Sequence, residues 1–216
     1  ERKLFDDDQY QIMDQRPKGL ATSAARTREK HGARLFNNAF SVDSLFYVNS
    51  EGVSLCSDAH TTTTPGVSTA TGFDNLATSG MSMTSVIANR IQMRGFRDDN
   101  GNRIDVMPDA LWYPPEKCAT AYEILESLGR PDNANNAANY NYKKFTGYEW
   151  NYMADPNDWF MTDSTLQKDM VMWFDRIPVE FARAQDLDTI VMKYRARMRY
   201  SFSFSDWRWA MGNQVS

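Results

Sequence analysis

The residue types of a serine hydrolase occur together in one short stretch of the chain, Ser57-Asp58-Ala59-His60. A serine acts as a nucleophile when a histidine accepts its proton and a carboxylate orients that histidine. The chain has no Gly-x-Ser-x-Gly turn, no Gly-x-Gly-x-x-Gly fingerprint and no Walker loop. A soluble hydrolase that uses Asp58 and His60 is therefore one alternative function. The ordinary alternative is that His60 forms hydrogen bonds within a loop.

Paired carboxylates and cysteines offer two further kinds of chemistry. Asp98 and Asp99 could act as a general acid and base, but that chemistry requires carboxylates in a partly dry cleft. The Asn100-Gly101 pair that follows them favours a solvated tight turn instead. Cys56 and Cys118 lack the spacing of a zinc site or of a disulfide framework. We therefore expect free thiols, no catalytic residues, no metal and no cofactor.

A row of four cations stands out near the C-terminus: Lys193, Arg195, Arg197 and Arg199. Apolar residues alternate with these cations over residues 190–204. Side chains alternate across a strand, so this spacing predicts a single strand with an apolar face and a cationic face. A strand of that length extends about 50 Å, whereas a usual strand has five or six residues. Such length indicates an extended protein that contacts its neighbours.

The cationic row has three candidate partners: solvent, an acidic neighbouring subunit, or the phosphates of packaged nucleic acid. Charged residues on a solvated strand protect a sheet edge from aggregation. The whole chain carries a net charge of −4, which would repel DNA and argues against a dedicated nucleic-acid binder. We therefore expect contact between subunits in preference to contact with phosphate. No segment approaches the roughly 20 apolar residues that span a bilayer, so no membrane partner is expected.

The remaining sequence pattern predicts an α+β fold. Apolar residues at helical spacing predict a helix over residues 17–40 and another over residues 74–91, with Asp74 as its N-cap. Residues 110–113 predict a buried strand, and residues 114–129 a helix that begins at a proline and ends at a glycine. Further short strands are predicted at residues 45–48, 148–152, 159–161, 170–173 and 179–181.

Several short motifs follow one another along residues 20–212. They are Glu51–His60, Asn75-Leu76, Asp98–Gly101, Pro108–Pro115, Ala134–Asn136, Trp159–Met161 with Asp163, and Asp206–Trp209. In this order and approximate spacing they resemble the major capsid (head) proteins of tailed bacteriophages, closest to the Mu-like major head subunit group. The serial match carries the resemblance, since no single motif is diagnostic.

This resemblance implies a Hong-Kong-type phage capsid fold, an α+β fold with a peripheral and an axial domain. It implies that residues 1–44 form the N-terminal segment and the spine helix of the peripheral domain. Residues 45–145 would form mainly the axial domain, residues 146–205 the long β-ribbon of the peripheral domain, and residues 206–216 a return strand to the axial domain. The apolar face of the long strand is then expected to face the helix at residues 17–40.

The resemblance also implies a structural subunit and not an enzyme. Such subunits form hexamers and pentamers that close into an icosahedral shell around double-stranded DNA, which they contact non-specifically. A portal and scaffold or cement proteins are implied as further partners, with assembly in the host bacterial cytoplasm and a final location in the virion. An encapsulin-like nanocompartment shell is the alternative with the same fold. Relatives carry an N-terminal arm and an extended loop that do not fit ahead of Arg16, so we expect maturation cleavage or an omitted segment.

Overall fold

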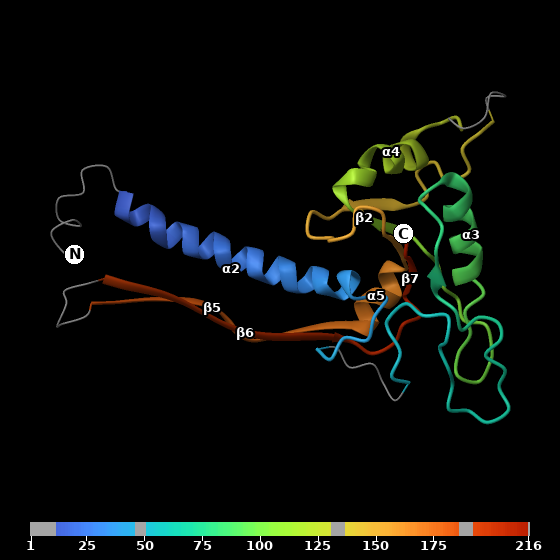
Figure 1. Cartoon of the computed structure of the whole chain (residues 1–216), viewed down its shortest axis with the longest axis horizontal. Coiled ribbons are helices and arrows are strands. Elements are labelled where there is room, and N and C mark those ends of the chain that lie inside the picture. Colours follow the sequence, from blue (N-terminus) through green and yellow to red (C-terminus); the bar gives the residue numbers. More distant parts are fainter. Residues whose placement is uncertain (1–11, 46–50, 131–136, 186–191, 216) are drawn as a thin grey trace. The chain divides into compact units, whose positions relative to one another are not determined.

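The computed structural model divides into two compact units (Figure 1). Unit 1 comprises Glu1–Gly32 and Trp173–Phe202, and unit 2 comprises Ala33–Met172 and Ser203–Ser216. The strand predicted at residues 45–48 lies outside the described residues, apart from Leu45. The structure describes residues 12–45, 51–130, 137–185 and 192–215.

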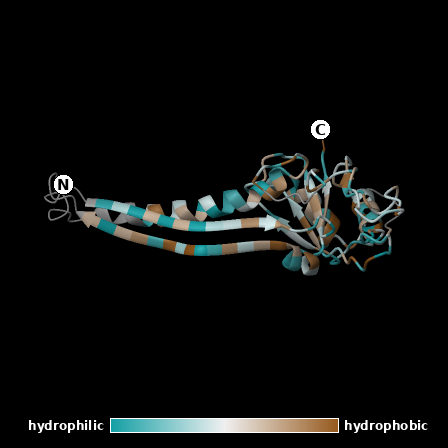
Figure 2. Cartoon of the chain, turned by 90° about the horizontal axis from the view of Figure 1, so that it is seen from below, coloured by the Kyte–Doolittle hydropathy of each residue, from teal (hydrophilic) through white to brown (hydrophobic). Residues whose placement is uncertain are grey.

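Unit 1 contains a long helix and a two-stranded ribbon. The residues of helix α2 (Ile12–Asn37) up to Gly32 belong to this unit. Strand β5 (Val171–Gln185) pairs with β6 (Met192–Phe204), and the arrowheads of the two strands point in opposite directions (Figure 2). The helix predicted over residues 17–40 and the long strand predicted near the C-terminus are thus confirmed.

The strands predicted at residues 170–173 and 179–181 are confirmed as strand except at Met170, which ends α5 (Ser164–Met170), but they are not separate, because residues 171–173 and 179–181 both belong to the single strand β5. Polar residues and Pro178 between them interrupt the apolar pattern that the prediction used. Proline cannot donate a ladder hydrogen bond, and it is tolerated in strands that have an open edge. Each strand of a two-stranded ribbon has such an edge, so β5 continues through Pro178.

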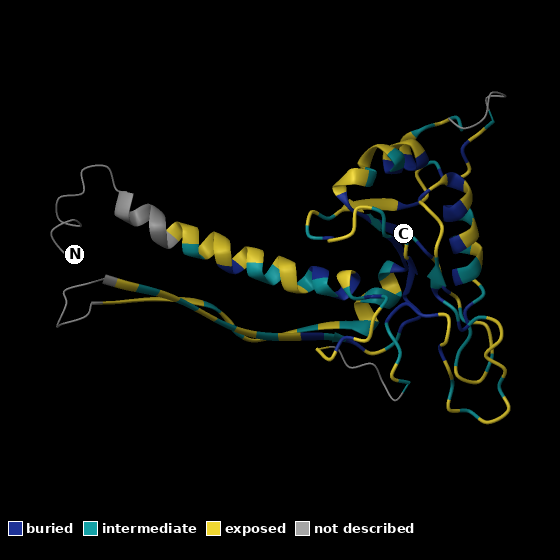
Figure 3. Cartoon of the chain, in the orientation of Figure 1, coloured by how far each residue is buried: buried dark blue, intermediate teal, exposed yellow. Residues whose placement is uncertain are grey.

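Unit 2 is organised around a five-stranded sheet with the order β1-β7-β4-β2-β3. The inner strands β4 and β7 pair antiparallel and are buried at every residue, whereas the edge strand β3 is exposed throughout (Figure 3). The outer pairs β1–β7 and β2–β3 are parallel, and β2–β4 is antiparallel. The strands are β1 (Leu76–Ala77), β2 (Ala110–Tyr113), β3 (Thr146–Glu149), β4 (Trp159–Thr162) and β7 (Ala210–Asn213).

The strands predicted at residues 110–113 and 159–161 are therefore confirmed, since they coincide with β2 and β4. The strand predicted at residues 148–152 is confirmed only in part, because β3 ends at Glu149. Both buried strands have continuous apolar runs, which is the pattern of strands covered on two faces.

The helices of unit 2 correct one prediction and add one element. The predicted helix over residues 74–91 begins at Met83 as α3 (Met83–Met93), and Ser82 caps it by accepting the Ser85 N–H at 3.1 Å. Asp74 instead accepts the N–H of Leu76, at the start of β1. A short polar side chain serves a turn as readily as a helix cap, so the sequence pattern did not distinguish them.

The helix predicted over residues 114–129 is confirmed as a short 3-10 turn η1 (Pro115–Lys117) that leads into α4 (Cys118–Glu126), but it ends at Glu126 and not at Gly129. The sequence pattern missed α5 (Ser164–Met170), which is only two turns long. The α5 N-terminus is satisfied by the Asp163 carboxylate, which accepts the N–H groups of Thr165 and Leu166.

Aromatic rings cover the sheet of unit 2 where the last turns of α2 reach it. The Phe36 ring is 3% exposed and lies with its centroid 4.7 Å from that of Phe160 and 5.4 Å from that of Trp112. The Phe40 ring stacks on Phe160 at 5.4 Å. These aromatic rings bury large apolar area and prefer the tilted and offset geometries seen here.

Gly212 allows this close packing. A Cβ placed on Gly212 would meet Cys56 Sγ and Phe40 Cε1 at 2.7 Å, and Phe160 Cε1 at 3.0 Å. Real Cβ atoms do not approach other atoms so closely, so any side chain would force the rings or the backbone apart.

We expect Gly212→Ala to lower the free energy of unfolding by about 1–3 kcal/mol, through overpacking of this site. Urea unfolding followed by tryptophan fluorescence measures the change. The matched control is Gly80→Ala, because a Cβ at Gly80 meets no atom within 4 Å. Equal stability of the two variants would contradict the assigned role of Gly212.

Candidate functional site

The exposed face of β6 presents the cationic row that the sequence predicts. Solvent exposure alternates along the strand, and hydrophilic and hydrophobic residues follow one another along both ribbon strands in Figure 2. The exposed positions are Lys193, Arg195, Arg197 and Arg199. The half-buried positions are Tyr194, Ala196, Met198 and Tyr200.

The opposite face of β6 contacts the unit 1 part of α2. The Tyr200 hydroxyl forms a hydrogen bond with His31 Nδ1, and the two rings lie edge to face with centroids 5.6 Å apart. The Arg28 guanidinium lies over the rings of Trp173 and Tyr200, at 5.1 and 5.7 Å from their centroids. The prediction that the apolar face of the long strand faces this helix is thus confirmed at Tyr200.

An ion pair joins the same surfaces. Arg28 donates to the Asp175 carboxylate at 2.9 Å, and the Trp173 indole N–H donates to it at 3.1 Å. The indole hydrogen bond and then Arg28 lower the pKa of Asp175. Both charged side chains keep a third or more of their surface exposed, so the pair contributes little to stability and mainly sets geometry.

Aromatic side chains of β5 are exposed on the ribbon. Phe174 is 60% exposed and Phe181 is 54% exposed. Exposed aromatic residues beside arginines are typical of surfaces that contact other proteins.

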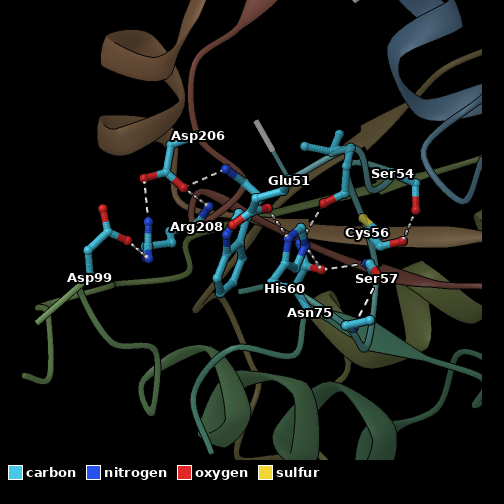
Figure 4. A network of polar contacts seen from close by, with 12 residues as sticks. Glu51, Ser54, Cys56, Ser57, His60, Asn75, Asp99, Asp206 and Arg208 are labelled. Atoms are coloured by element: carbon cyan, nitrogen blue, oxygen red, sulfur yellow. Dashed lines mark hydrogen bonds and ion pairs between the residues drawn. The ribbon is translucent and has the colours of Figure 1, made fainter. Parts of the chain in front are cut away.

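His60, the candidate catalytic histidine, lies in a buried polar network of unit 2 (Figure 4). Its Nδ1 lies 3.0 Å from Glu51 Oε2, and its Nε2 lies 3.0 Å from Asn75 Oδ1. The His60 ring stacks on Trp207, with centroids 4.2 Å apart and planes 8° from parallel. His60 thus forms structural hydrogen bonds, but its partners Glu51 and Asn75 are 9 and 15 residues away, whereas the sequence pattern predicts hydrogen bonds within its own loop.

The hydrogen bonds of Asn75 assign the protons on His60. Asn75 Nδ2 donates to the carbonyls of Leu55 and Ala210, and its Oδ1 accepts the N–H of Ser57 at 2.8 Å. The amide orientation is thus fixed, so His60 Nε2 donates to Oδ1. The remaining nitrogen, Nδ1, lies within hydrogen-bond distance of Glu51 Oε2, so both ring nitrogens already have a partner and neither is directed at a serine.

The structure does not bring Asp58 and His60 together into a catalytic arrangement. Asp58 is exposed and forms no hydrogen bond with the described residues. Ser57 is buried, and its Oγ accepts the N–H of Ala59 at 3.1 Å. The histidine contacts therefore fit a structural role and not a nucleophile–base pair.

The acidic turn is also structural. Asp98 accepts the backbone N–H groups of Asn100 and Asn102, and the Asn102 hydrogen bond lowers the pKa of Asp98. Asp99 pairs at 2.7 Å with Arg208, whose side chain is 9% exposed. Arg208 was missed as a network residue, although its motif and the Asp98–Gly101 motif both stood out in the sequence.

Metal and membrane chemistry find no support among the described residues. No group of three or more histidine, cysteine or acidic residues in them could hold a metal ion. No helix within the same residues combines the length and apolar character that crossing a membrane requires. Both cysteines are free, and burial raises the pKa of the Cys56 thiol, which makes it unreactive.

The fold is similar to a solved structure described as the capsid of an empty GTA particle computed with C5 symmetry. The TM-score is 0.51 at 13% sequence identity, and the match covers 99% of this chain and 69% of that chain. This likeness defines the class of the molecule as a mixed α+β protein with a fold like that of a capsid protein.

The sequence profile of a family described as phage capsid protein matches residues 1–211. The chain belongs to this phage capsid protein family and is a structural capsid subunit. No curated protein matches the chain.

We expect His60→Ala to lower the free energy of unfolding by about 2–4 kcal/mol. The substitution removes the hydrogen-bond partner of Glu51 and of Asn75 Oδ1, and it leaves a cavity where the imidazole ring was. Thermal denaturation measures the loss. Asp58→Ala is the control and should change stability by less than about 0.5 kcal/mol. A hydrolase site would give the reverse pattern, in which both variants lose activity and keep their stability.

Proposed function

We propose that this capsid subunit is the major capsid protein of a tailed phage and has the Hong-Kong-type fold. Copies of the chain assemble into hexamers and pentamers of a closed icosahedral shell that encloses double-stranded DNA. The observation that carries this proposal is the family match over residues 1–211, which leaves only the last few residues outside. The solved structure of similar fold comes from an assembled particle, which supports self-assembly.

The two units support a division into the two domains of that fold. In this proposal, unit 1 with its helix and ribbon corresponds to the peripheral domain, and unit 2 with its five-stranded sheet corresponds to the axial domain. The proposed bounds differ from those expected from the sequence, 1–44 and 146–205 for the peripheral domain, because residues 33–44 and 146–172 belong to unit 2. Residues 206–216 would still contain the return strand.

The cationic row of β6 is proposed to face acidic residues of a neighbouring subunit. Phe174 and Phe181 on the same ribbon support a protein partner, because phosphate contact would leave these exposed aromatic rings unburied. The portal, scaffold or cement proteins and packaged DNA are proposed as further partners, with assembly in the host bacterial cytoplasm.

Expression of the chain and negative-stain imaging test the proposal. We expect closed particles of uniform size, and a monodisperse monomer would contradict the proposal. Particles isolated from phage should absorb at 260 nm in the manner of DNA. An encapsulin-like compartment would instead contain a protein cargo and lack that absorbance.

Replacing Arg195, Arg197 and Arg199 together with glutamine should reduce the assembled fraction at least about tenfold, since three charge-assisted contacts between subunits would be lost. Sedimentation and imaging measure the fraction. The matched control replaces three exposed cations outside the row with glutamine: Arg26, Arg103 and Lys168. Normal empty shells that retain less DNA would show that the row faces phosphate.

A further inference from the structure

Unit 2 has a concave surface on which cations surround exposed apolar groups. A cavity of about 260 Å³ lies between α3 and the segment that contains Tyr140. Lys144 adds its ammonium group 3.2 Å from the centroid of the Tyr140 ring. We call this surface the cationic patch and define it by six residues, Ile87, Arg90, Ile91, Arg94, Tyr140 and Lys144.

Buried amides hold the segment that presents Tyr140 and Lys144. Asn139 is 7% exposed and donates through Nδ2 to the carbonyls of Ile124 and Ser127, at 2.8 Å each. Asn139 Oδ1 accepts the N–H of Asn141, which is fully buried. These bonds fix the turn before any partner binds, so its backbone loses little further freedom on binding.

The charges of the cationic patch are not neutralised within the described chain. Arg90 donates at 2.7 Å to the hydroxyl of Tyr140, and Lys144 and Arg90 lower the pKa of that hydroxyl. Arg90, Arg94 and Lys144 form no ion pair with a described carboxylate, whereas Arg34 and Arg208 do. The cationic patch is therefore available to an anionic partner.

Apolar groups at the cavity distinguish between anionic partners. Ile91 is 69% exposed and Tyr140 is 54% exposed, and both line the cavity between the cations. An apolar centre with arginine and tyrosine at its margin is the usual composition of a protein–protein interface. A DNA phosphate backbone would leave Ile91 in water, so these residues favour a protein partner that is both acidic and apolar.

The same unit displays a surface with this complementary chemistry. Residues 116–128 carry three glutamates and one lysine. Two large apolar residues there are strongly exposed, Tyr122 at 66% and Leu128 at 72%. The three glutamates are exposed and form no ion pair with a described residue. We define the acidic patch as Glu116, Tyr122, Glu123, Glu126 and Leu128.

We propose that the cationic patch of one subunit binds the acidic patch of a second copy of this chain. The inference rests on the proposed function, since a shell brings many copies together. A contact between two different patches of identical chains forms a ring when the rotation from one copy to the next closes, and hexamers and pentamers require contacts of this kind. Opposite charges select the register, and the exposed apolar residues of both patches lose contact with water.

Charge reversal on each patch tests this pairing in the full chain. One variant carries Arg94→Glu and Lys144→Glu, and the other carries Glu123→Lys and Glu126→Lys. We expect each variant to reduce the assembled fraction at least about tenfold, because like charges then face each other. A third variant with all four substitutions restores opposite charges and should assemble to within about twofold of the unmodified chain.

The matched control for the Arg94/Lys144 variant is Arg103→Glu with Lys168→Glu, which makes the same change of net charge at exposed positions of unit 2 and should assemble normally. Circular dichroism should show that every variant is folded. If the assembled fraction does not recover in the variant that carries all four substitutions, the proposed pairing is wrong. Shells formed normally by the Arg94/Lys144 variant but with weaker DNA retention would also overturn it and would assign the cationic patch to nucleic acid.

Failure of the proposed function gives a different result. In that case the unmodified chain itself would remain monomeric, and no shell-dependent pairing would exist. The proposed pairing alone predicts that loss of assembly is confined to the variants with one reversed patch. Assembly should return when both patches are reversed together.

Discussion

Unit 2 depends on one close contact at Gly212. Four chain segments pack together there because glycine has no side chain. Phe40 from the turn after α2, Cys56 from an irregular segment and Phe160 from β4 all lie within 3.0 Å of the place where a Cβ would be. Close packing of this kind provides dispersion energy but leaves no space for adjustment. The contact joins residues that are far apart in sequence, so the aromatic core and the inner strands of the sheet form together.

The irregular parts of unit 2 place a second constraint on the chain, because buried backbone groups without a partner are costly. Short polar side chains supply those partners. Asn75 satisfies three backbone groups and orients His60, Asn139 satisfies two carbonyls, and Asp163 accepts the N–H of Met107 as well as those at the start of α5. These residues explain why a unit with long segments outside helices and strands holds a defined shape.

Charge is distributed in a manner that suits an assembly subunit. Charged groups that lie inside the fold are neutralised by their own chain. Arg208, whose side chain is 9% exposed, pairs with Asp99 and Asp206. The buried Asp43 pairs with Arg34, which lowers the pKa of Asp43 to about 2. The cationic row of β6 and the cationic patch are instead exposed. Inside the fold an unpaired charge would be expensive, whereas at an interface the partner supplies the opposite charge. The exposed charges therefore mark the surfaces where further copies are proposed to bind.

Local sequence pattern was enough to predict the elements whose pattern is long or strongly apolar: the helix at residues 17–40, the alternating strand over 190–204 and the buried run at 110–113. Their periodicities follow from local geometry, so no tertiary contact was needed to recognise them. Three features became clear from the folded chain alone: the helix after Asp74 begins at Met83, β5 continues through Pro178, and His60 is a structural group. Those outcomes depend on hydrogen-bond partners distant in sequence, which competing local patterns do not reveal.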